Sequence, residues 1–278
     1  MDLKCAWKEL LAILPPWLRL EVDRQGGITL QEIRLRRHKS VVLVGDKGSV
    51  VLPRSAEQDD LQYVINAACR YSPWTAATTA QGYITAPGGH RIGICGEALI
   101  RSGEMQGIGV VTSLNIRVAR DFTGISSNLW LRNEGILILG PPGSGKTTLL
   151  RDLIRQRSQR DNISVVDERG EIFPPAADFQ MGTNTDVLTG CSKRQGITFV
   201  LRAMSPDCIA VDEITASEDC DALIQAGGCG VSLLATAHAS SVSDLQIRPV
   251  YTPLVTSGLF RLAVVLRKDK SWYMERII

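Results

Sequence analysis

Long apolar runs, paired cysteines and a large charge excess are all missing from this sequence of 278 residues. No stretch reaches the roughly 18 uncharged apolar residues that a membrane-spanning helix needs. The seven cysteines include no Cys-x-x-Cys pair, and with three histidines no zinc-site spacing occurs. The net charge of +2 does not argue for a general nucleic-acid-binding surface, so any basic patch would have to be local. We therefore expect a cytoplasmic protein without a structural zinc or a membrane span.

Length and composition fit two globular domains. Hydrophobic residues make up 44% of the chain and charged residues 22%, both near the average for folded proteins. Residues 1–125 mix strand-like and helical runs without regular alternation, and glycine-rich residues 83–118 suggest an antiparallel sheet, so a smaller α+β domain is expected first. A polar linker is expected at residues 121–133. From residue 126 to 278, buried-strand runs alternate with helices, which predicts a mostly parallel sheet with helices on both faces.

The strongest motif begins at Gly140 and has the spacing of a phosphate-binding loop. An apolar strand run, residues 135–139, precedes it, and an amphipathic helical run, residues 145–158, follows. Glycines let successive backbone N–H groups face an anion, and the helix adds the positive end of its dipole. The second domain is therefore predicted to be an α/β P-loop NTPase of the RecA-like type that binds ATP and Mg²⁺. The residues expected to hold the nucleotide are Gly140, Pro141, Pro142, Gly143, Ser144, Gly145, Lys146, Thr147 and Thr148.

Two acids follow a second buried-strand run, residues 208–211. Strands of a parallel sheet end at the same edge, so Asp212 is expected beside the phosphate loop, holding the metal together with the Thr147 hydroxyl. Lys146 would reach the β and γ phosphates, and Glu213 would polarise the attacking water.

Two more strand ends carry side chains that can act on a nucleotide. Glu168 follows residues 163–167 and is a second candidate for positioning the water, so the sequence leaves open which acid does so. His238 follows residues 231–235 and is expected to sense the γ-phosphate, because imidazole can donate a hydrogen bond in either protonation state.

These four strand ends, in this order, resemble the secretion ATPases, the P-loop motors of type II and type IV secretion and of type IV pili. The family has a phosphate loop, an acidic box, a metal-binding strand and a Thr-x-His box. The matching segments are residues 140–147, 167–171, 212–213 and 236–238. One departure is Asp212, where general secretion ATPases usually have glycine.

A closer resemblance, to a family of sporulation ATPases, covers nearly the whole chain. It rests on the matching segments 32–36, 113–120, 165–172, 185–188 and 202–214. This resemblance implies a ring-forming motor, expected to be a hexamer, that hydrolyses ATP to energise a secretion-like transmembrane complex during endospore formation. It also implies a cytoplasmic protein held at the membrane, on the mother-cell side, by a small membrane protein.

The resemblance further implies that arginines of the first domain complete the site. Arg117 and Arg120, near the linker, are the candidates, and they could act in cis or in trans. Two other functions stay open. The basic cluster at residues 34–39 allows a nucleic-acid-dependent ATPase, although nucleic acid is the less favoured partner, and a slowly hydrolysing, nucleotide-gated scaffold is the third possibility.

Overall fold

The computed structural model describes residues 2–26, 29–69, 82–129 and 134–277. The chain packs as two compact units, Leu3–Asp121 with Pro175–Asp178, and Met1–Asp2 with Phe122–Pro174 and Phe179–Ile278. The start of the expected linker forms the short strand β8 (Asp121–Thr123), which pairs with β1 (Asp2–Lys4), while residues 130–133 lie outside the described residues.

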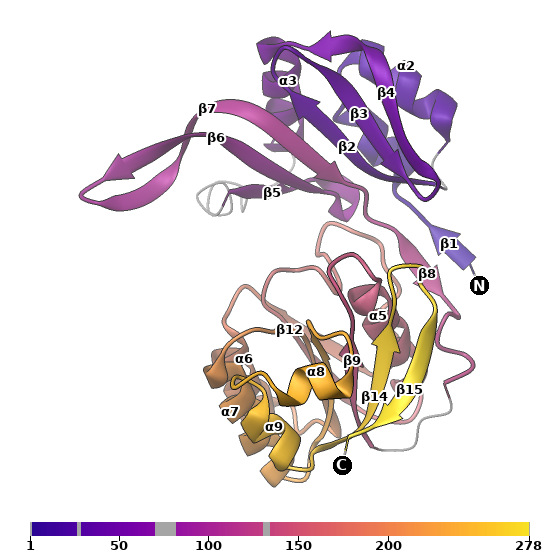
Figure 1. Ribbon diagram of the computed structural model, residues 1–278, viewed down its shortest axis with the longest axis vertical. Coiled ribbons are helices and arrows are strands. Elements are labelled where there is room, and N and C mark those ends of the chain that lie inside the picture. Colours follow the sequence, from indigo (N-terminus) through magenta and orange to yellow (C-terminus); the bar gives the residue numbers. More distant parts are fainter. Residues whose placement is uncertain (1, 27–28, 70–81, 130–133, 278) are drawn as a thin grey trace. The chain divides into compact units, whose positions relative to one another are not determined.

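The unit nearer the N-terminus is built on a six-stranded antiparallel sheet of order β4-β3-β2-β7-β6-β5 (Figure 1). Its elements are α1 (Trp7–Ala12), α2 (Pro16–Gln25), β2 (Leu30–Arg36), β3 (Lys39–Gly45), β4 (Gly48–Ala56), α3 (Gln58–Cys69), β5 (Tyr83–Thr85), the 3₁₀ turn η1 (Pro87–Gly89), β6 (Arg91–Arg101) and β7 (Glu104–Arg117). Alternate residues such as Ile33 and Leu35 of β2 are buried, and Leu61 and Val64 of α3 belong to the same core. The expected antiparallel α+β fold is confirmed.

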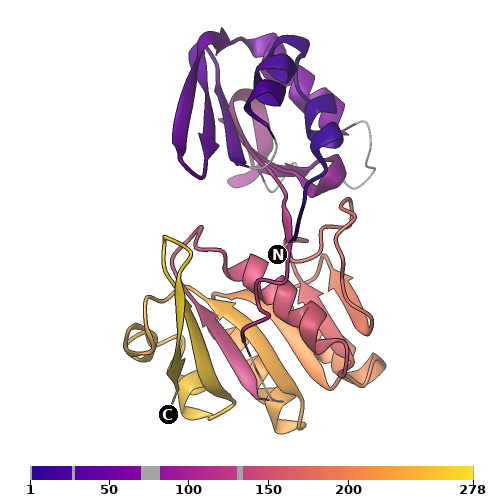
Figure 2. The same ribbon diagram turned by 90° about the vertical axis from the view of Figure 1, so that its right-hand side faces the viewer.

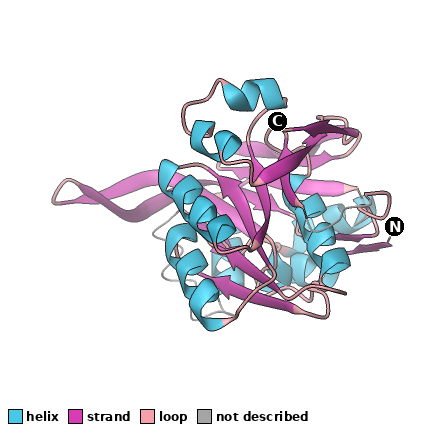
Figure 3. Ribbon diagram, turned by 90° about the horizontal axis from the view of Figure 1, so that it is seen from below, coloured by secondary structure: helices cyan, strands magenta, loops and turns pink. Residues whose placement is uncertain are grey.

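Strands β6 and β7 continue past their neighbours as a two-stranded ribbon (Figure 3). Only residues 113–117 of β7 pair with β2, so the outer part of the ribbon is flanked by no other strand among the described residues.

The second unit is built on a seven-stranded sheet of order β11-β10-β12-β13-β9-β14-β15. All neighbouring pairs are parallel except the last, β14 with β15. Its elements are β9 (Gly135–Leu139), α5 (Lys146–Arg157), β10 (Ile163–Asp167), β11 (Thr185–Thr189), α6 (Lys193–Ala203), β12 (Cys208–Ile214), α7 (Ser217–Gly228), β13 (Ser232–Ala237), α8 (Val242–Gln246), α9 (Thr252–Thr256), β14 (Phe260–Leu266) and β15 (Trp272–Arg276). The expected mostly parallel α/β sheet is confirmed.

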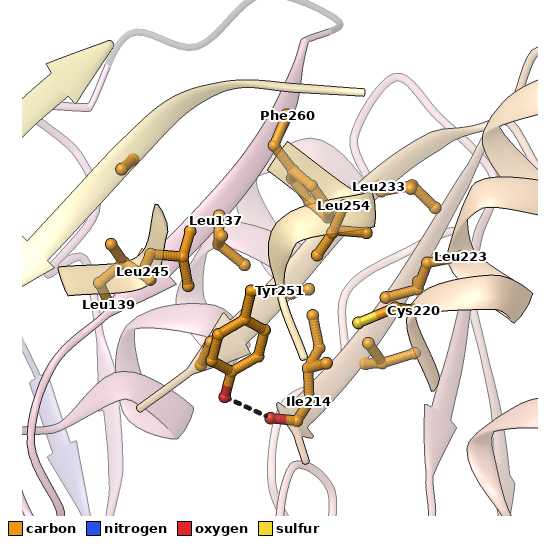
Figure 4. Close-up of a cluster of buried hydrophobic side chains, with 14 of the residues drawn as sticks. Leu137, Leu139, Ile214, Cys220, Leu223, Leu233, Leu245, Tyr251, Leu254 and Phe260 are labelled. Carbon is orange, nitrogen blue, oxygen red and sulfur yellow. Dashed lines mark hydrogen bonds between the residues drawn. The ribbon is translucent and has the colours of Figure 1, made fainter. Parts of the chain in front are cut away.

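Helices cover both faces of this sheet, and alternate side chains of β9 pack against the helices of opposite faces. Ile136 and Ile138 pack in one core with apolar residues of α5, which runs along that face (Figure 2). Leu137 and Leu139 belong to the opposite core, with residues of α6, α7, α8 and α9 (Figure 4). Each fully buried side chain of this size contributes roughly 1.5–3 kcal/mol, so packing on both faces stabilises β9.

In the second of these cores, Tyr251 fixes the end of β12. Its hydroxyl donates to the Ile214 carbonyl across 2.9 Å, directly after the two acids of that strand (Figure 4). None of the described helices is both long and apolar enough to cross a membrane.

Candidate active site

The loop between β9 and α5 is shaped by its glycines. Gly145, directly before α5, has φ 100° and Gly143 has φ 74°, left-handed conformations that side chains other than glycine rarely adopt. At Gly140 there is no room for a side chain, because a Cβ there would lie 2.5 Å from Ser144 Oγ and 2.9 Å from the Leu266 carbonyl oxygen. The backbone is thereby turned into a tight loop whose amides lead into the N-terminus of α5.

Lys146 folds its side chain back into this loop and is only 6% exposed. Its Nζ donates to the carbonyls of Gly140 (2.9 Å) and Pro141 (3.1 Å) and lies 3.0 Å from His238 Nδ1. Burial lowers the pKa of Lys146, while the charges of Asp212 and Glu213 act in the opposite direction. The buried ammonium of Lys146 thus lies in the loop, within reach of a phosphate bound there.

Asp212 reaches the same loop although its strand is not next to β9. Strand β13 lies between them in the sheet, and its Thr236 donates to Asp212 Oδ1. On the other side, the Thr147 hydroxyl donates to Asp212 Oδ2 across 2.6 Å. A hydroxyl and a carboxylate are the hard oxygen donors that Mg²⁺ prefers, so these two residues fit the expected metal.

Two features of the loop itself also fit a bound nucleotide. The Ser144 hydroxyl is buried and has no hydrogen-bond partner among the described residues, and a buried hydroxyl normally has one. At Gly143 and Gly145 an added Cβ would meet nothing within 4 Å, so space is open beside the loop. Both observations fit a bound phosphate. Thr148, in the first turn of α5, completes the expected set.

A β-bulge brings both acids of β12 to this edge. Val211 pairs with Ala235 and Ile214 with Ala237, so three steps along β12 match two along β13. Glu213 takes up the extra residue with φ 52°, a strained conformation for a residue with a side chain that costs roughly 1–3 kcal/mol. In a regular strand the two neighbouring acids would point to opposite faces.

Glu213 is held between His238 and Arg169. Its Oε1 lies 2.8 Å from His238 Nε2, and its Oε2 lies 3.0 Å from an Arg169 guanidinium nitrogen. Since the Lys146 ammonium can only donate to Nδ1 of His238, the geometry fits the tautomer that carries its proton on Nε2 and donates it to Glu213. Burial raises the pKa of Glu213, but the hydrogen bond from His238 and the charges of Arg169 and Lys146 outweigh burial and lower it.

Glu168, the other candidate for positioning the water, has a different partner. Its Oε2 lies 2.6 Å from Nζ of Lys193 in α6, a buried cation that also faces Asp219 at 3.6 Å. The hydrogen bonds of the site therefore join Glu213, rather than Glu168, to His238 and through it to Lys146. Lys193 was not expected, since nothing in its sequence neighbourhood marks it as a partner of Glu168.

Asp167, the residue before Glu168, organises the turn after β10. Its buried carboxylate accepts hydrogen bonds from the backbone N–H groups of Glu171 (2.8 Å), Ile172 (2.9 Å) and Phe173 (2.9 Å). Burial, and secondarily the charge of Asp212, raise the pKa of Asp167 to about 6, against the pull of these N–H groups. The folded protein therefore binds this proton more tightly than the unfolded chain. The resulting stability is complete below about pH 3.8 and is lost as the pH rises through about 6.

We expect Asp167→Ala to lower the free energy of unfolding by about 2–4 kcal/mol, because several buried N–H groups lose their acceptor. The loss should be larger at pH 5 than at pH 8, since the proton-linked stability of Asp167 is present only below its raised pKa. Urea unfolding at both pH values measures it. Asp186→Ala, which removes an exposed carboxylate from β11 of the same sheet, should cost less than about 0.5 kcal/mol, and an equal cost for both variants would contradict this role.

The two candidate arginines belong to the other unit. Arg117 ends β7 with an exposed side chain and pairs across the sheet with Glu32, whereas Arg120 lies 3.5 Å from Asp46. Their assignment to the site stays a prediction. Lys270 is a further residue that the sequence did not point to: it lies in the turn between β14 and β15, and its Nζ donates to the Gly143 carbonyl.

Comparison with known proteins places this arrangement in a family. The model of the family described as sporulation stage III, protein AA, matches residues 9–274. Stage III sporulation protein AA of Bacillus subtilis (strain 168) is 36% identical over 262 residues, covering 87% of this chain and 84% of that protein.

Solved structures agree on the fold. The pilus retraction motor PilT with bound ADP superposes with a TM-score of 0.59 at 16% identity, over 89% of this chain and 76% of that one. The ATPase DotB of Legionella pneumophila gives a TM-score of 0.54 at 17% identity, over 95% and 80%. The fold is thus that of the secretion ATPases, an antiparallel α+β sheet followed by a mostly parallel α/β sheet. Because the family model spans nearly the whole sequence, this chain belongs to the sporulation stage III protein AA family.

Proposed function

We propose that this protein hydrolyses ATP with Mg²⁺ and works as a motor. One observation carries the proposal: Lys146, Asp212 and Glu213, from a loop-helix junction and a bulged strand, converge on the N-terminus of α5. Pairing a phosphate loop with acids from another strand end of the same sheet edge is what phosphoryl transfer to water needs. The bound ADP in PilT, a protein of the same fold, also supports the proposal.

Each residue has a distinct task in this proposal. When bound through Thr147 and Asp212, Mg²⁺ would neutralise charge on the phosphates. The loop amides and Lys146 bind and orient the phosphate chain, with Lys146 leaving its carbonyl partners in the loop to do so. Glu213 orients the attacking water as a carboxylate, and His238, hydrogen-bonded to both Glu213 and Lys146, reports on the γ-phosphate.

The biological role follows from the family name, and we propose it on that ground. The protein would form a ring, a hexamer in our expectation, and energise a secretion-like transmembrane complex during endospore formation. It would work in the cytoplasm on the mother-cell side, held at the membrane by a small membrane protein. Arg117 and Arg120 would complete the site from the first domain, in cis or in trans.

Two measurements on the purified chain test this function. Phosphate release from ATP should depend on Mg²⁺, and light scattering coupled to size exclusion should show a larger assembly with a non-hydrolysable ATP analogue than without nucleotide. If the protein binds ATP but never hydrolyses it, even with its membrane partner, the motor function is contradicted and the nucleotide-gated scaffold is favoured instead. A single protomer under both conditions would contradict the ring.

The nucleic-acid-dependent alternative gains no support from the basic cluster at residues 34–39. Arg34 lies 2.7 Å from Glu32, and His38 lies 2.8 Å from Glu57, so acids accompany part of the cluster. A steep salt dependence in a DNA or RNA filter-binding titration would nevertheless revive it.

We expect Arg169→Gln to move the acid limb of the kcat profile to higher pH. Arg169 is one of the groups that lower the Glu213 pKa, so its removal raises that pKa, and the reactive carboxylate becomes protonated at higher pH. The turnover number tests this when it is measured from well below pH 4.5, the ordinary pKa of a glutamate, up to the alkaline range. Arg160→Gln, a change of the same charge at an exposed residue after α5, should leave the limb in place, and an unmoved limb in Arg169→Gln would show that Arg169 does not bias Glu213.

A further inference from the structure

The turn between β14 and β15 reaches the phosphate loop. Lys270 in this turn is exposed, yet its Nζ donates to the carbonyl of Gly143 in the middle of the loop. Figure 1 shows β14 beside β9, the strand that leads into the loop, with β15 on the far side of β14. The contact therefore joins two segments 127 residues apart in sequence.

The hairpin is held in register with the loop by its backbone. Strand β14 pairs in parallel with β9 up to Val265 opposite Leu139, the residue before Gly140. One residue further, the Leu266 carbonyl lies so close to Gly140 that an added Cβ would come within 2.9 Å of it. The turn itself is closed by the Arg267 N–H, which donates to the Ser271 carbonyl across 2.9 Å. The strand pairing and the turn bond thus bring Lys270 to the loop.

The charge of Lys270 is not taken up by the acid next to it. Asp269 Oδ1 accepts hydrogen bonds from the N–H (3.0 Å) and the hydroxyl (2.6 Å) of Ser271. These bonds lower the pKa of Asp269, so it stays ionised while bound to the turn. Arg267 and Lys268 add further positive charge, which makes the end of the hairpin cationic.

The bond to the Gly143 carbonyl also orients the next amide. In a trans peptide the carbonyl and the following N–H point in opposite directions. The Gly143 carbonyl accepts the bond from Lys270, and on the other side of the same peptide the Ser144 N–H donates to the Pro141 carbonyl across 3.2 Å. Pro141 is the carbonyl that Lys146 also contacts, so the peptide held by Lys270 shares an acceptor with the lysine of the loop.

We propose that Lys270 is a positioning residue for nucleotide binding: its bond to the Gly143 carbonyl holds the Gly143–Ser144 peptide, and with it the shape of the phosphate-binding loop. This inference rests on the proposed ATPase function and adds to it a residue from outside the motifs of the site. Because Lys270 acts on the loop rather than on the reacting atoms, its loss changes affinity and leaves turnover at saturation intact.

The test compares Lys270→Met with two matched variants in the full chain. A fluorescent ADP analogue gives the Kd, and phosphate release gives KM and kcat. For Lys270→Met we expect Kd and KM to rise about tenfold, which corresponds to about 1.4 kcal/mol, with kcat within about twofold of wild type. Lys270→Arg should restore most of the affinity, because guanidinium can make the same bond. Lys268→Met removes the same charge from the same turn and should change Kd by less than about twofold.

Other outcomes overturn the inference. An unchanged Kd in Lys270→Met, or an equal loss in Lys268→Met, would show that the contact does not set affinity, or that only general charge does. Lys270→Gly, which suits the positive φ of 71° at this residue, repeats the test should the methionine variant unfold, and an unchanged Kd there is equally decisive. Wild-type protein that fails to bind the ADP analogue would overturn the proposed function itself, whereas tight binding unaffected by these variants overturns only the role of Lys270.

Discussion

Replacing Lys146 with alanine should reduce kcat/KM for ATP hydrolysis by at least about 1000-fold, the scale of removing a cation that stabilises a phosphoryl group in transfer. The ammonium is buried at the start of α5, within hydrogen-bond reach of loop carbonyls and of His238, and its charge acts on Asp212 and Glu213. Phosphate release at saturating and limiting ATP measures the effect.

The thermal midpoint of the Lys146→Ala variant shows whether its loss of activity comes from misfolding. Burial lowers the pKa of Lys146, which means that the fold disfavours its charged form. Alanine should therefore leave the thermal midpoint unchanged or raise it, while activity disappears. Lys268→Ala, an exposed lysine in the same unit, should keep full activity. A Lys146→Ala variant that retained a tenth of wild-type turnover would refute its role in catalysis.

Glu213→Gln should lower kcat by about 100- to 1000-fold, the usual range for losing a group that activates a nucleophile. Glutamine keeps the size of the side chain and can still accept a hydrogen bond from His238, but it cannot take a proton from water. Nucleotide affinity should stay within a few-fold of wild type, since the phosphate loop and Lys146 are untouched. Single-turnover hydrolysis measures the rate of the chemical step, and binding of an ADP analogue measures the nucleotide affinity.

The matched control is Glu168→Gln, the other acid that the sequence offered. Because Glu168 is paired with Lys193, its substitution should change kcat by less than about threefold. If the two variants exchanged behaviour, Glu168 would be the acid that positions the water. Equal and large losses would mean that the two carboxylates act as a pair.

The fold class could be predicted because buried strands leave a local signature. Residues 135–139 are a continuous apolar run and residues 163–166 are apolar except for Ser164, and both lie within strands that are buried along their whole length, β9 and β10. Strand β11 was harder, since Thr185–Thr189 is partly exposed at the edge of the sheet and mixes polar with apolar residues. Edge strands bury too little surface to be read from hydrophobicity alone.

The candidate site was only partly visible in the sequence. The phosphate loop is contiguous, so its residues and their order were evident. The sequence did not distinguish Glu213 from Glu168. The difference between them depends on their partners Lys193, Arg169 and His238, which lie far along the sequence from the acids that they contact in space. Lys270 carries no motif at all and meets the loop only through the pairing of β14 with β9.

By itself, the sequence determined which strands would be buried, where the backbone could turn around an anion, and which acids would stand at strand ends, because glycine conformation and apolar burial are local properties. Only the tertiary structure decided the strand order, with β13 inserted between β9 and β12, and the bulge that brings Asp212 and Glu213 to one edge. Those features arise from hydrogen bonds between strands distant along the chain, and no local pattern of residues encodes such pairing.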